Sequence, residues 1–256
     1  DYIQGLPARR GQERPPSICE NLAERGVNLA VLPVERTDWA RGILGRVASG
    51  SFWAYEETPA TLFGWYLQLV DEVVRAEVER TGERVVLVGH SAGGWLARAA
   101  LADGTWMGEG TTRSRDLVAG LVTLGAPHFP PRPDTPLKDM TRGALSQVDS
   151  CYPGAFLKSE GISYVTVCGT GLSNPTGYEQ VTGFRGGDGD GVVPLEAAHL
   201  EGALQLTLPG CFHSVTFPTS WYGSPQFLDV WLKEAVAPAT PALGLDLAVR
   251  RLFGRV

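Results

Sequence analysis

Residues 89–93 (GHSAG) form a G-x-S-x-G pattern, which is typical of a nucleophilic serine held in a tight turn. The apolar run 84–88 (RVVLV) precedes the pattern directly, and a helical stretch at 93–102 follows it. A strand–turn–helix placement would lift the Ser91 hydroxyl clear of a sheet and point the helix N-terminus at a reacting carbonyl. In such a turn the backbone N–H of Ala92 is an oxyanion donor. The pattern therefore predicts nucleophilic attack by Ser91 on a carbonyl carbon.

A serine nucleophile needs a histidine as general base, and two histidines lie in the C-terminal quarter of the chain. His213 follows an apolar run in a loop, from which it could reach the turn at Ser91. His199 lies within 196–201, which we predict to be helical, and a surface role suits it better. The residues alone favour His213 but leave both open.

The base in turn needs a carboxylate to orient it, and residues 186–194 (GGDGDGVVP) supply two. Asp188 and Asp190 are both flanked by glycine in a predicted loop, so either could turn inward toward a histidine. A solvated turn is the plainer alternative. A calcium loop is disfavoured because the later glutamate of an EF-hand is missing. We expect no metal and no cofactor.

Further side chains are candidates for a substrate pocket. His90 adjoins the serine, and His128 follows a predicted strand at the same edge of the sheet, where we expect a pocket wall. Tryptophans are candidates for an apolar acyl site, although most of these aromatic residues suit a core better. The tryptophans considered are Trp53, Trp95, Trp106 and Trp221.

Buried strands are predicted to alternate with helices, which favours an α/β fold with a mostly parallel central sheet and helices on both faces. Capping patterns mark two helix starts, one at Ser17 with Glu20 and one at Thr58 before Pro59. The predicted strands are 27–34, 84–88, 117–124, 162–167 and 204–208. The predicted helices are 17–25, 58–81 and 93–102.

The chain is divided into an arm, one domain and a tail. Residues 1–16 are polar and form the arm, 17–236 form the domain, and 237–256 read as a linker and tail. Within the domain, the proline-rich segment 126–158 is either a lid-like insertion or a surface crossover. The basic, leucine-containing end 243–256 could touch a membrane, but a docked helix or disorder is favoured.

Composition excludes several classes of protein. With 256 residues, 43% hydrophobic and 20% charged, the chain is neither disordered nor a coiled coil. No apolar run approaches the roughly 18 residues of a membrane span. A net charge of −6 gives no reason to expect a nucleic-acid partner. Four cysteines, expected to be reduced, and the lack of an N-glycosylation pattern indicate an intracellular location. They are Cys19, Cys151, Cys168 and Cys211.

A combination of motifs resembles the lipase-type α/β-hydrolases, and among them the PGAP1-like hydrolases of plants, algae and cyanobacteria. The motifs are GHSAGGW, LVTLGAPH, GDGVVP, AHLEGA and a late HS, and the likeness runs from about residue 26 to 232. The resemblance implies Ser91 as nucleophile, Asp190 as acid and His213 as base. It also implies a hydrophobic or lipid-like ester as substrate and, since the family is mostly plastid or cyanobacterial, a plastid location. The alternative location is the cytoplasm, and no oligomeric state is predicted.

One departure from this family concerns the oxyanion hole. Relatives carry a strand and a Gly-rich turn before the first helix, and that turn supplies the second oxyanion N–H. In this chain residues 14–16 (RPP) run straight into the helix cap at Ser17. We expect that a segment is missing here, the alternative being a weakened variant.

The sequence thus predicts a serine hydrolase of carboxylic esters, lipase- or esterase-like, that acts through an acyl-enzyme. An acyl-thioesterase or amidase on the same triad is one alternative. The other is a weakly active or non-catalytic lipid-binding protein on a hydrolase fold, which the missing oxyanion turn motivates.

Overall fold

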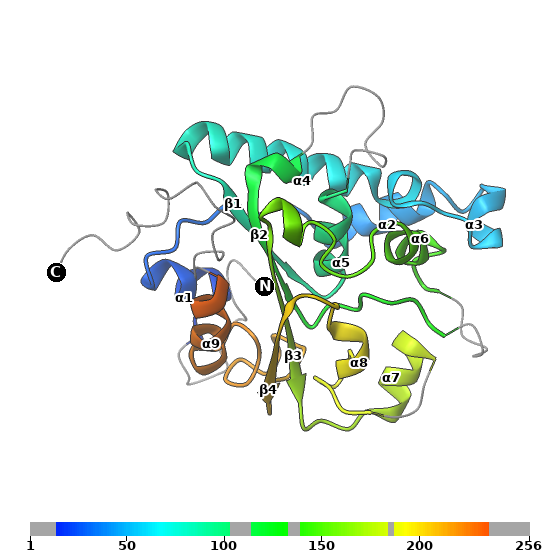
Figure 1. Ribbon diagram of the computed structural model, residues 1–256. Coiled ribbons are helices and arrows are strands. Elements are labelled where there is room, and N and C mark those ends of the chain that lie inside the picture. The colour runs from blue at the N-terminus through cyan, green and yellow to red at the C-terminus, as the bar shows by residue number, and fades with distance from the viewer. Residues whose placement is uncertain (1–13, 103–113, 133–138, 184–186, 236–256) are drawn as a thin grey trace.

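A single parallel sheet forms the centre of the computed structural model, which describes residues 14–102, 114–132, 139–183 and 187–235. The strand order is β1-β2-β3-β4, and each neighbouring pair is parallel (Figure 1). Four of the five predicted strands are therefore confirmed, and their carboxyl ends all lie at one edge of the sheet. The strands are β1 (Val85–His90), β2 (Val118–Leu124), β3 (Ser163–Thr170) and β4 (Leu204–Pro209).

Helices cover both faces of this sheet, as the sequence predicts (Figure 1). On one face, α4, α5 and α6 bury a large apolar cluster against β1 and β2. On the other face, α1 and α9 pack against β2 and β3. The helices are α1 (Ile18–Glu24), α2 (Arg36–Leu44), α3 (Gly50–Ala54), α4 (Pro59–Thr81), α5 (Ala92–Ala100), α6 (Ala144–Cys151), α7 (Pro175–Thr182), α8 (Leu195–Ala198) and α9 (Pro225–Ala235). Two 3₁₀ turns are η1 (Ser114–Leu117) and η2 (Lys158–Glu160).

The two predicted helix starts are confirmed by their caps. The Ser17 hydroxyl accepts the N–H of Glu20 at 3.1 Å, and the Glu20 carboxylate accepts the N–H of Ser17 at 2.7 Å. At the start of α4, the Thr58 hydroxyl accepts the N–H of Thr61 at 3.0 Å. Each cap satisfies a backbone donor that the first turn of a helix leaves without a partner.

The prediction of a strand at 27–34 is wrong. This segment is extended and half-buried at alternate residues, but it forms no ladder with a neighbouring strand. Val27 and Leu29 pack against the cluster beneath α1 and α9, whereas Leu32 and Val34 pack against the cluster beneath α4 and α5. The apolar pattern was therefore a signal of burial. A strand also needs a hydrogen-bonding partner, which the described residues do not offer here.

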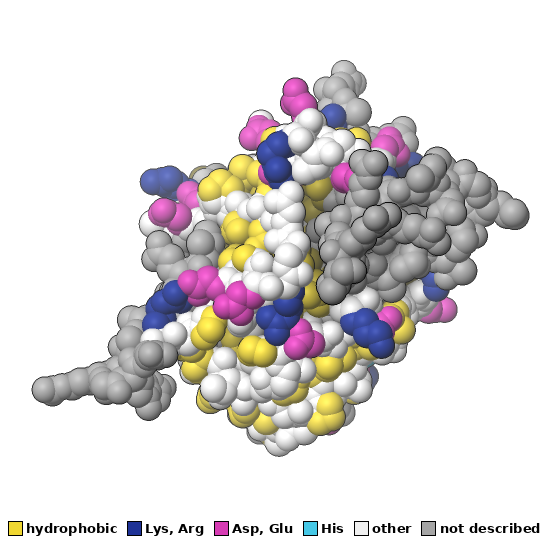
Figure 2. Space-filling view, turned by 90° about the vertical axis from the view of Figure 1, so that its left-hand side faces the viewer, with side chains coloured by type: hydrophobic (Ala, Val, Ile, Leu, Met, Phe, Trp, Pro, Cys, Tyr) yellow, Lys and Arg dark blue, Asp and Glu magenta, His cyan; other side chains and the backbone are white. Residues whose placement is uncertain are grey.

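Because that partner is lacking among the described residues, β1 is an outer strand of the sheet, with one side unpaired by any other described strand. Val86 and Val88 of β1 are 38% and 46% exposed, and Val31 is 42% exposed. Figure 2 shows the side of the molecule that lies on the left in Figure 1, where apolar side chains gather in the middle of the face. The described chain enters α1 from residues 14–16 without a strand, as the sequence indicated.

Two further expectations concern segments outside the sheet. The predicted helix at 196–201 is shorter than expected, because α8 ends at Ala198 and His199 is already extended, with φ −108° and ψ 139°. The proline-rich segment contains α6, and its residues 133–138 lie outside the described residues, as do 1–13 and 236–256 of the arm and tail. Among the described helices, none combines the length and apolar character needed to cross a bilayer.

Candidate active site

Ser91 stands in the turn between β1 and α5, which confirms the predicted strand–turn–helix placement. Its backbone angles, φ 53° and ψ −127°, lie outside the regions that non-glycine residues ordinarily adopt. Close packing of the strand and helix imposes this turn, because a Cβ atom at Gly89 would lie 2.6 Å from the Cα of Gly94. The strained turn is the geometry of a nucleophile elbow.

The N-terminus of α5 lies directly beside Ser91. No side chain caps this first turn, and among its backbone donors the N–H of Gly94 donates to the Ser91 carbonyl at 3.0 Å. The N–H of Ala92 is the first of them. Before α1 the structure describes only residues 14–17, which form neither a strand nor a Gly-rich turn.

His213 and Asp190 form a buried pair at the carboxyl edge of the sheet. Nδ1 of His213 lies 2.8 Å from Oδ2 of Asp190, and the His213 N–H donates to the Asp190 carbonyl at 2.9 Å. The side chains come from the loops that follow β3 and β4. A hydrogen bond from Nδ1–H to the carboxylate fixes the imidazole tautomer and leaves the Nε2 lone pair available for a proton.

Three further donors hold the Asp190 carboxylate. Oδ1 accepts the N–H groups of Val192 at 3.0 Å and Val193 at 2.7 Å, and Oδ2 also accepts the hydroxyl of Tyr222 at 2.6 Å. Burial would raise the pKa of Asp190. The hydrogen bond and charge of His213, followed by the Tyr222 and Val193 hydrogen bonds, instead bring this pKa below its usual value. Asp190 is therefore a buried carboxylate that stays ionised.

The register of the sheet places this pair beside the serine. His90 pairs with Leu124, so the residues that follow them, Ser91 and Gly125, are neighbours, and the Ser91 N–H donates to the Leu124 carbonyl at 3.0 Å. Gly125 has φ 53°, and a Cβ atom there would lie 3.0 Å from Nδ1 of His213 and would collide with the Asp190 carboxylate. In the described structure Ser91 Oγ forms no hydrogen bond to His213, a contact that is often long in enzymes without substrate.

Sequence reasoning missed Gly125 and Tyr222 as parts of this site. Gly125 lies in the LGAPH motif and carries a signal, since a glycine that directly follows a strand often marks a close approach. Tyr222 belongs to no recognisable pattern. Only its position, nine residues after His213, hints at a role.

The alternative acid and base lie elsewhere. The exposed Asp188 carboxylate accepts the N–H groups of Gly171 at 2.5 Å and Gly189 at 2.8 Å, as a loop-stabilising aspartate does. His199 Nδ1 lies 2.9 Å from the hydroxyl of Thr166. Asp188 and His199 both line a separate pocket of about 440 Å³. In the described part of the chain, no three or more histidine, cysteine, aspartate or glutamate side chains gather as a metal-binding group.

Two of the six side chains considered for a substrate pocket lie at the site. The rings of His90 and His213 are 4.6 Å apart, and His90 Nε2 lies 3.0 Å from the His213 carbonyl. Burial, together with the neighbouring His213, lowers the pKa of His90 to about 3, so its ring is neutral and donates to that carbonyl. Trp221 meets His90 edge-on, with 6.2 Å between the ring centroids.

The other pocket candidates that the structure describes have different surroundings, and a pocket role for them stays a prediction. Trp95 is 2% exposed and belongs to the apolar core beneath α4 and α5. His128 is completely buried and hydrogen-bonded to Thr123, so it is part of the interior. Trp53 is 61% exposed on α3. Aromatic character alone does not distinguish a core side chain from one that lines a pocket. Trp106 lies outside the described residues.

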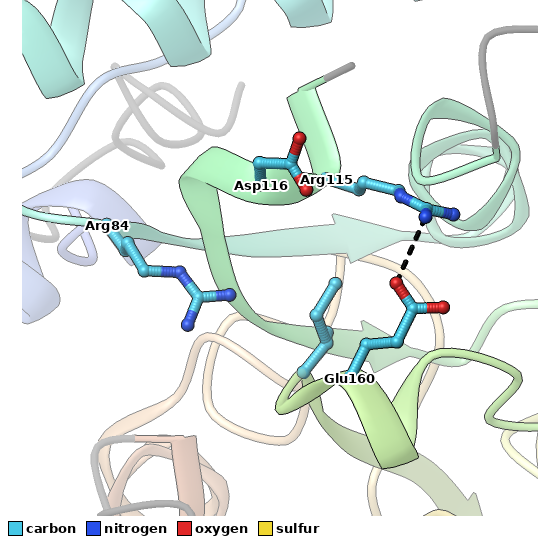
Figure 3. A pocket seen from close by; sticks show the side chains of 5 residues that line it. Arg84, Arg115, Asp116 and Glu160 are labelled. Atoms are coloured by element: carbon cyan, nitrogen blue, oxygen red, sulfur yellow. Dashed lines mark ion pairs between the residues drawn. The ribbon is translucent and has the colours of Figure 1, made fainter. Parts of the chain in front are cut away.

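The opposite edge of the sheet carries a different polar group. A pocket of about 270 Å³ lies where β1, β2 and β3 begin, lined by Arg84, Arg115, Asp116, Glu160 and Ile162. Arg115 and Glu160 form an ion pair at 3.0 Å, with Arg84 across the pocket (Figure 3). Arg115 and Glu160 bind each other, whereas Arg84 donates to the Val118 carbonyl, and the pocket lies at the opposite end of the strands from Ser91.

Comparisons with known proteins identify the family. The PGAP1-like alpha/beta domain matches residues 65–238, which is more than half of the chain. No curated protein matches. Two solved structures resemble the fold, and both are of the Bacillus licheniformis lipase BlEst2. The mature form is 16% identical with a TM-score of 0.42, covering 70% of this chain and 76% of that one. The propeptide form is 18% identical with a TM-score of 0.44, covering 74% and 44%.

The family match confirms the α/β-hydrolase fold that the motifs predict, whereas the plant, algal or cyanobacterial affinity stays a prediction. The match covers the elbow at Ser91 and the loops of Asp190 and His213. The chain belongs to the PGAP1-like α/β domain family.

Proposed function

We propose that the protein is a serine hydrolase that cleaves a carboxylic ester of a hydrophobic or lipid-like substrate. The observation that carries the proposal is the buried His213–Asp190 pair, joined at 2.8 Å beside the strained turn of Ser91. Membership of the PGAP1-like family supports hydrolase chemistry. Ser91 follows β1, His213 lies in the loop after β4, and Asp190 lies in the loop between α7 and α8.

The reaction proceeds through an acyl-enzyme. Ser91 Oγ attacks the ester carbonyl while His213 Nε2 takes its proton, and the tetrahedral intermediate forms. The intermediate collapses as the imidazolium returns that proton to the leaving alkoxide, which departs as an alcohol. Water, deprotonated by His213, then attacks the acyl-serine and releases the acid. Asp190 stabilises the imidazolium throughout but stays ionised.

The Ala92 N–H at the start of α5 stabilises the oxyanion, with the helix N-terminus behind it. Removing one oxyanion donor costs about 10²- to 10³-fold in rate in serine hydrolases. The residues described before α1 form no strand with a Gly-rich turn that would supply a second donor, which favours slow turnover. This same observation favours the second candidate function, a lipid-binding protein with little or no catalysis.

Labelling by a fluorophosphonate tests the proposal. We expect stoichiometric label on Ser91 in the native protein and none on Ser91→Ala. The control variant is Ser150→Ala, which removes an exposed hydroxyl on α6. Hydrolysis of p-nitrophenyl esters should fall by at least about 10³-fold in Ser91→Ala.

Equal labelling of Ser91→Ala, or no label on the native protein, would overturn the mechanism. Binding of long-chain esters without turnover would favour the lipid-binding function. A thioester that outcompetes the matching ester would place the activity among acyl-thioesterases, which use the same triad.

A further inference from the structure

Tyr222 contacts the candidate triad through the carboxylate of Asp190. Its hydroxyl donates to Oδ2 of Asp190 at 2.6 Å, the oxygen that also binds Nδ1 of His213 at 2.8 Å. The same hydroxyl accepts the N–H of Gly169 at 2.9 Å. Because Gly169 supplies a donor, the Tyr222 proton is directed to the carboxylate.

The surroundings hold this phenol in one position. Tyr222 is completely buried in the cluster beneath α1 and α9, and the Trp231 indole N–H donates to its carbonyl at 2.9 Å. A Cβ atom at Gly125 would lie 2.7 Å from the Tyr222 hydroxyl, so even a methyl group is excluded there. Such a fixed hydroxyl cannot turn away from Asp190 without unpacking the core.

Among the ionisable groups packed around the Tyr222–Asp190 hydrogen bond, the negative charge that the hydroxyl binds is that of Asp190. Burial lowers the pKa of His90 and raises those of the Cys168 and Cys211 thiols, so these groups are neutral near pH 7. Burial and the charge of Asp190 raise the pKa of Tyr222 well above its usual value, so it stays a donor. The other titratable side chains near the loop are Tyr178 of α7 and the exposed Asp188.

We propose that Tyr222 is a positioning residue that sets the basicity of His213 through Asp190. The inference rests on the proposed function. A hydrogen bond to Oδ2 draws electron density away from the oxygen that faces the imidazole. The carboxylate then stabilises the imidazolium less, so His213 stays neutral, and able to accept the Ser91 proton, to a lower pH.

The pH profile of kcat/KM in Tyr222→Phe tests this role. Removing the hydroxyl should move the acid limb upward by about half to one pH unit, since the carboxylate then holds the imidazolium more strongly. The plateau should fall by about three- to tenfold, because Asp190 is held by one donor fewer. The matched control is Tyr164→Phe, a buried tyrosine of β3 in the opposite core cluster, which should leave the limb in place.

Replacing Tyr222 with 3-fluorotyrosine gives the opposite test while keeping the fold. The more acidic phenol is a stronger donor, so the acid limb should move downward. A role in packing alone would lower stability in Tyr222→Phe and leave the limb fixed in both variants, and that result overturns the proposal.

The midpoint of the His213 titration, followed by proton NMR, separates this proposal from the proposed function. It should move upward in Tyr222→Phe and downward with 3-fluorotyrosine even if no ester is hydrolysed. An inactive native protein with these shifts would contradict the hydrolase activity and keep the positioning role. An active enzyme whose His213 titration does not shift in these variants would support the hydrolase activity and contradict the positioning role of Tyr222.

Discussion

At the carboxyl edge of the sheet, Asp190 and His213 are 1% and 8% exposed, and every oxygen of the carboxylate is hydrogen-bonded. At the amino edge, Arg115 and Glu160 form an ion pair whose side chains are 17% and 51% exposed. Both edges contain a pair of ionisable side chains at hydrogen-bonding distance. Water reaches the second pair and screens it, whereas the first pair interacts through a drier medium.

The backbone explains this difference. The carboxyl edge has Ser91 with φ 53° and Gly125 with φ 53°, conformations that the packed core around them maintains. The turn at Ser91 lies beside Gly125, and the Asp190 carboxylate and the His213 ring pack against Gly125. The amino edge has the ordinary starts of strands, and its side chains extend to the surface. Strained turns and burial therefore distinguish the reactive edge from the one that only carries charge.

The largest expected effect on activity comes from replacing one carboxylate oxygen of Asp190, at the carboxyl edge, with an amide nitrogen. In Asp190→Asn the amide no longer fixes the imidazole tautomer, and kcat for ester hydrolysis should fall by about 10⁴-fold. The matched change Asp188→Asn, in the same loop but exposed, should alter kcat less than about threefold. Steady-state kinetics on a p-nitrophenyl ester measures both.

Equal losses in the two variants would mean that the loop as a whole matters and not the buried carboxylate. A large loss of kcat in Asp188→Asn alone would mean that Asp188 is the catalytic acid and that the active site is the pocket it shares with His199.

A smaller effect is expected from adding one methyl group at Gly125. In Gly125→Ala the Cβ atom collides with the Asp190 carboxylate, so the free energy of unfolding should fall by about 2–4 kcal/mol. Activity should fall at least about tenfold, because the pair must shift. The control is Gly161→Ala, where φ is 85° but no atom lies within 4 Å, and the cost should be about 1–2 kcal/mol.

Urea denaturation of both variants separates the cost of a positive φ, which both share, from the cost of the collision with Asp190, which only Gly125→Ala has. If Gly125→Ala were no less stable than Gly161→Ala and fully active, the close packing of the reactive edge would not be required.

Much of the fold could be predicted from the sequence because local patterns determine it. The strands β1 to β4 and the caps at Ser17 and Thr58 follow from apolar runs and capping residues. The segment 27–34 has the same apolar pattern and is not a strand. Its conformation depends on a neighbour that no local pattern can reveal.

The candidate site could be predicted only in part. Ser91 lies in a motif whose geometry is local, whereas Asp188 and Asp190 have the same flanking residues. Only the tertiary contacts show that Asp190 meets His213. Tyr222 binds Asp190, which lies 32 residues earlier in the chain, and belongs to no motif. Trp95 and Trp53 show the converse, since identical side chains lie in the core and at the surface.

The smallest expected effect is at the amino edge. Glu160→Gln removes one charge of the ion pair with Arg115 but leaves a side chain of the same shape. Because Glu160 is half-exposed and its charge is screened, the free energy of unfolding should fall by less than about 1 kcal/mol. The loss should shrink further in 1 M salt, where the Debye length is about 3 Å. Ester hydrolysis should not change, because no strained turn couples this pair to Ser91. Urea denaturation at low and high salt measures the difference, with the exposed Glu201→Gln as control. A loss of activity in Glu160→Gln would contradict the separation of the two edges, since it would show that the pocket of Arg84 and Arg115 is coupled to the reactive one.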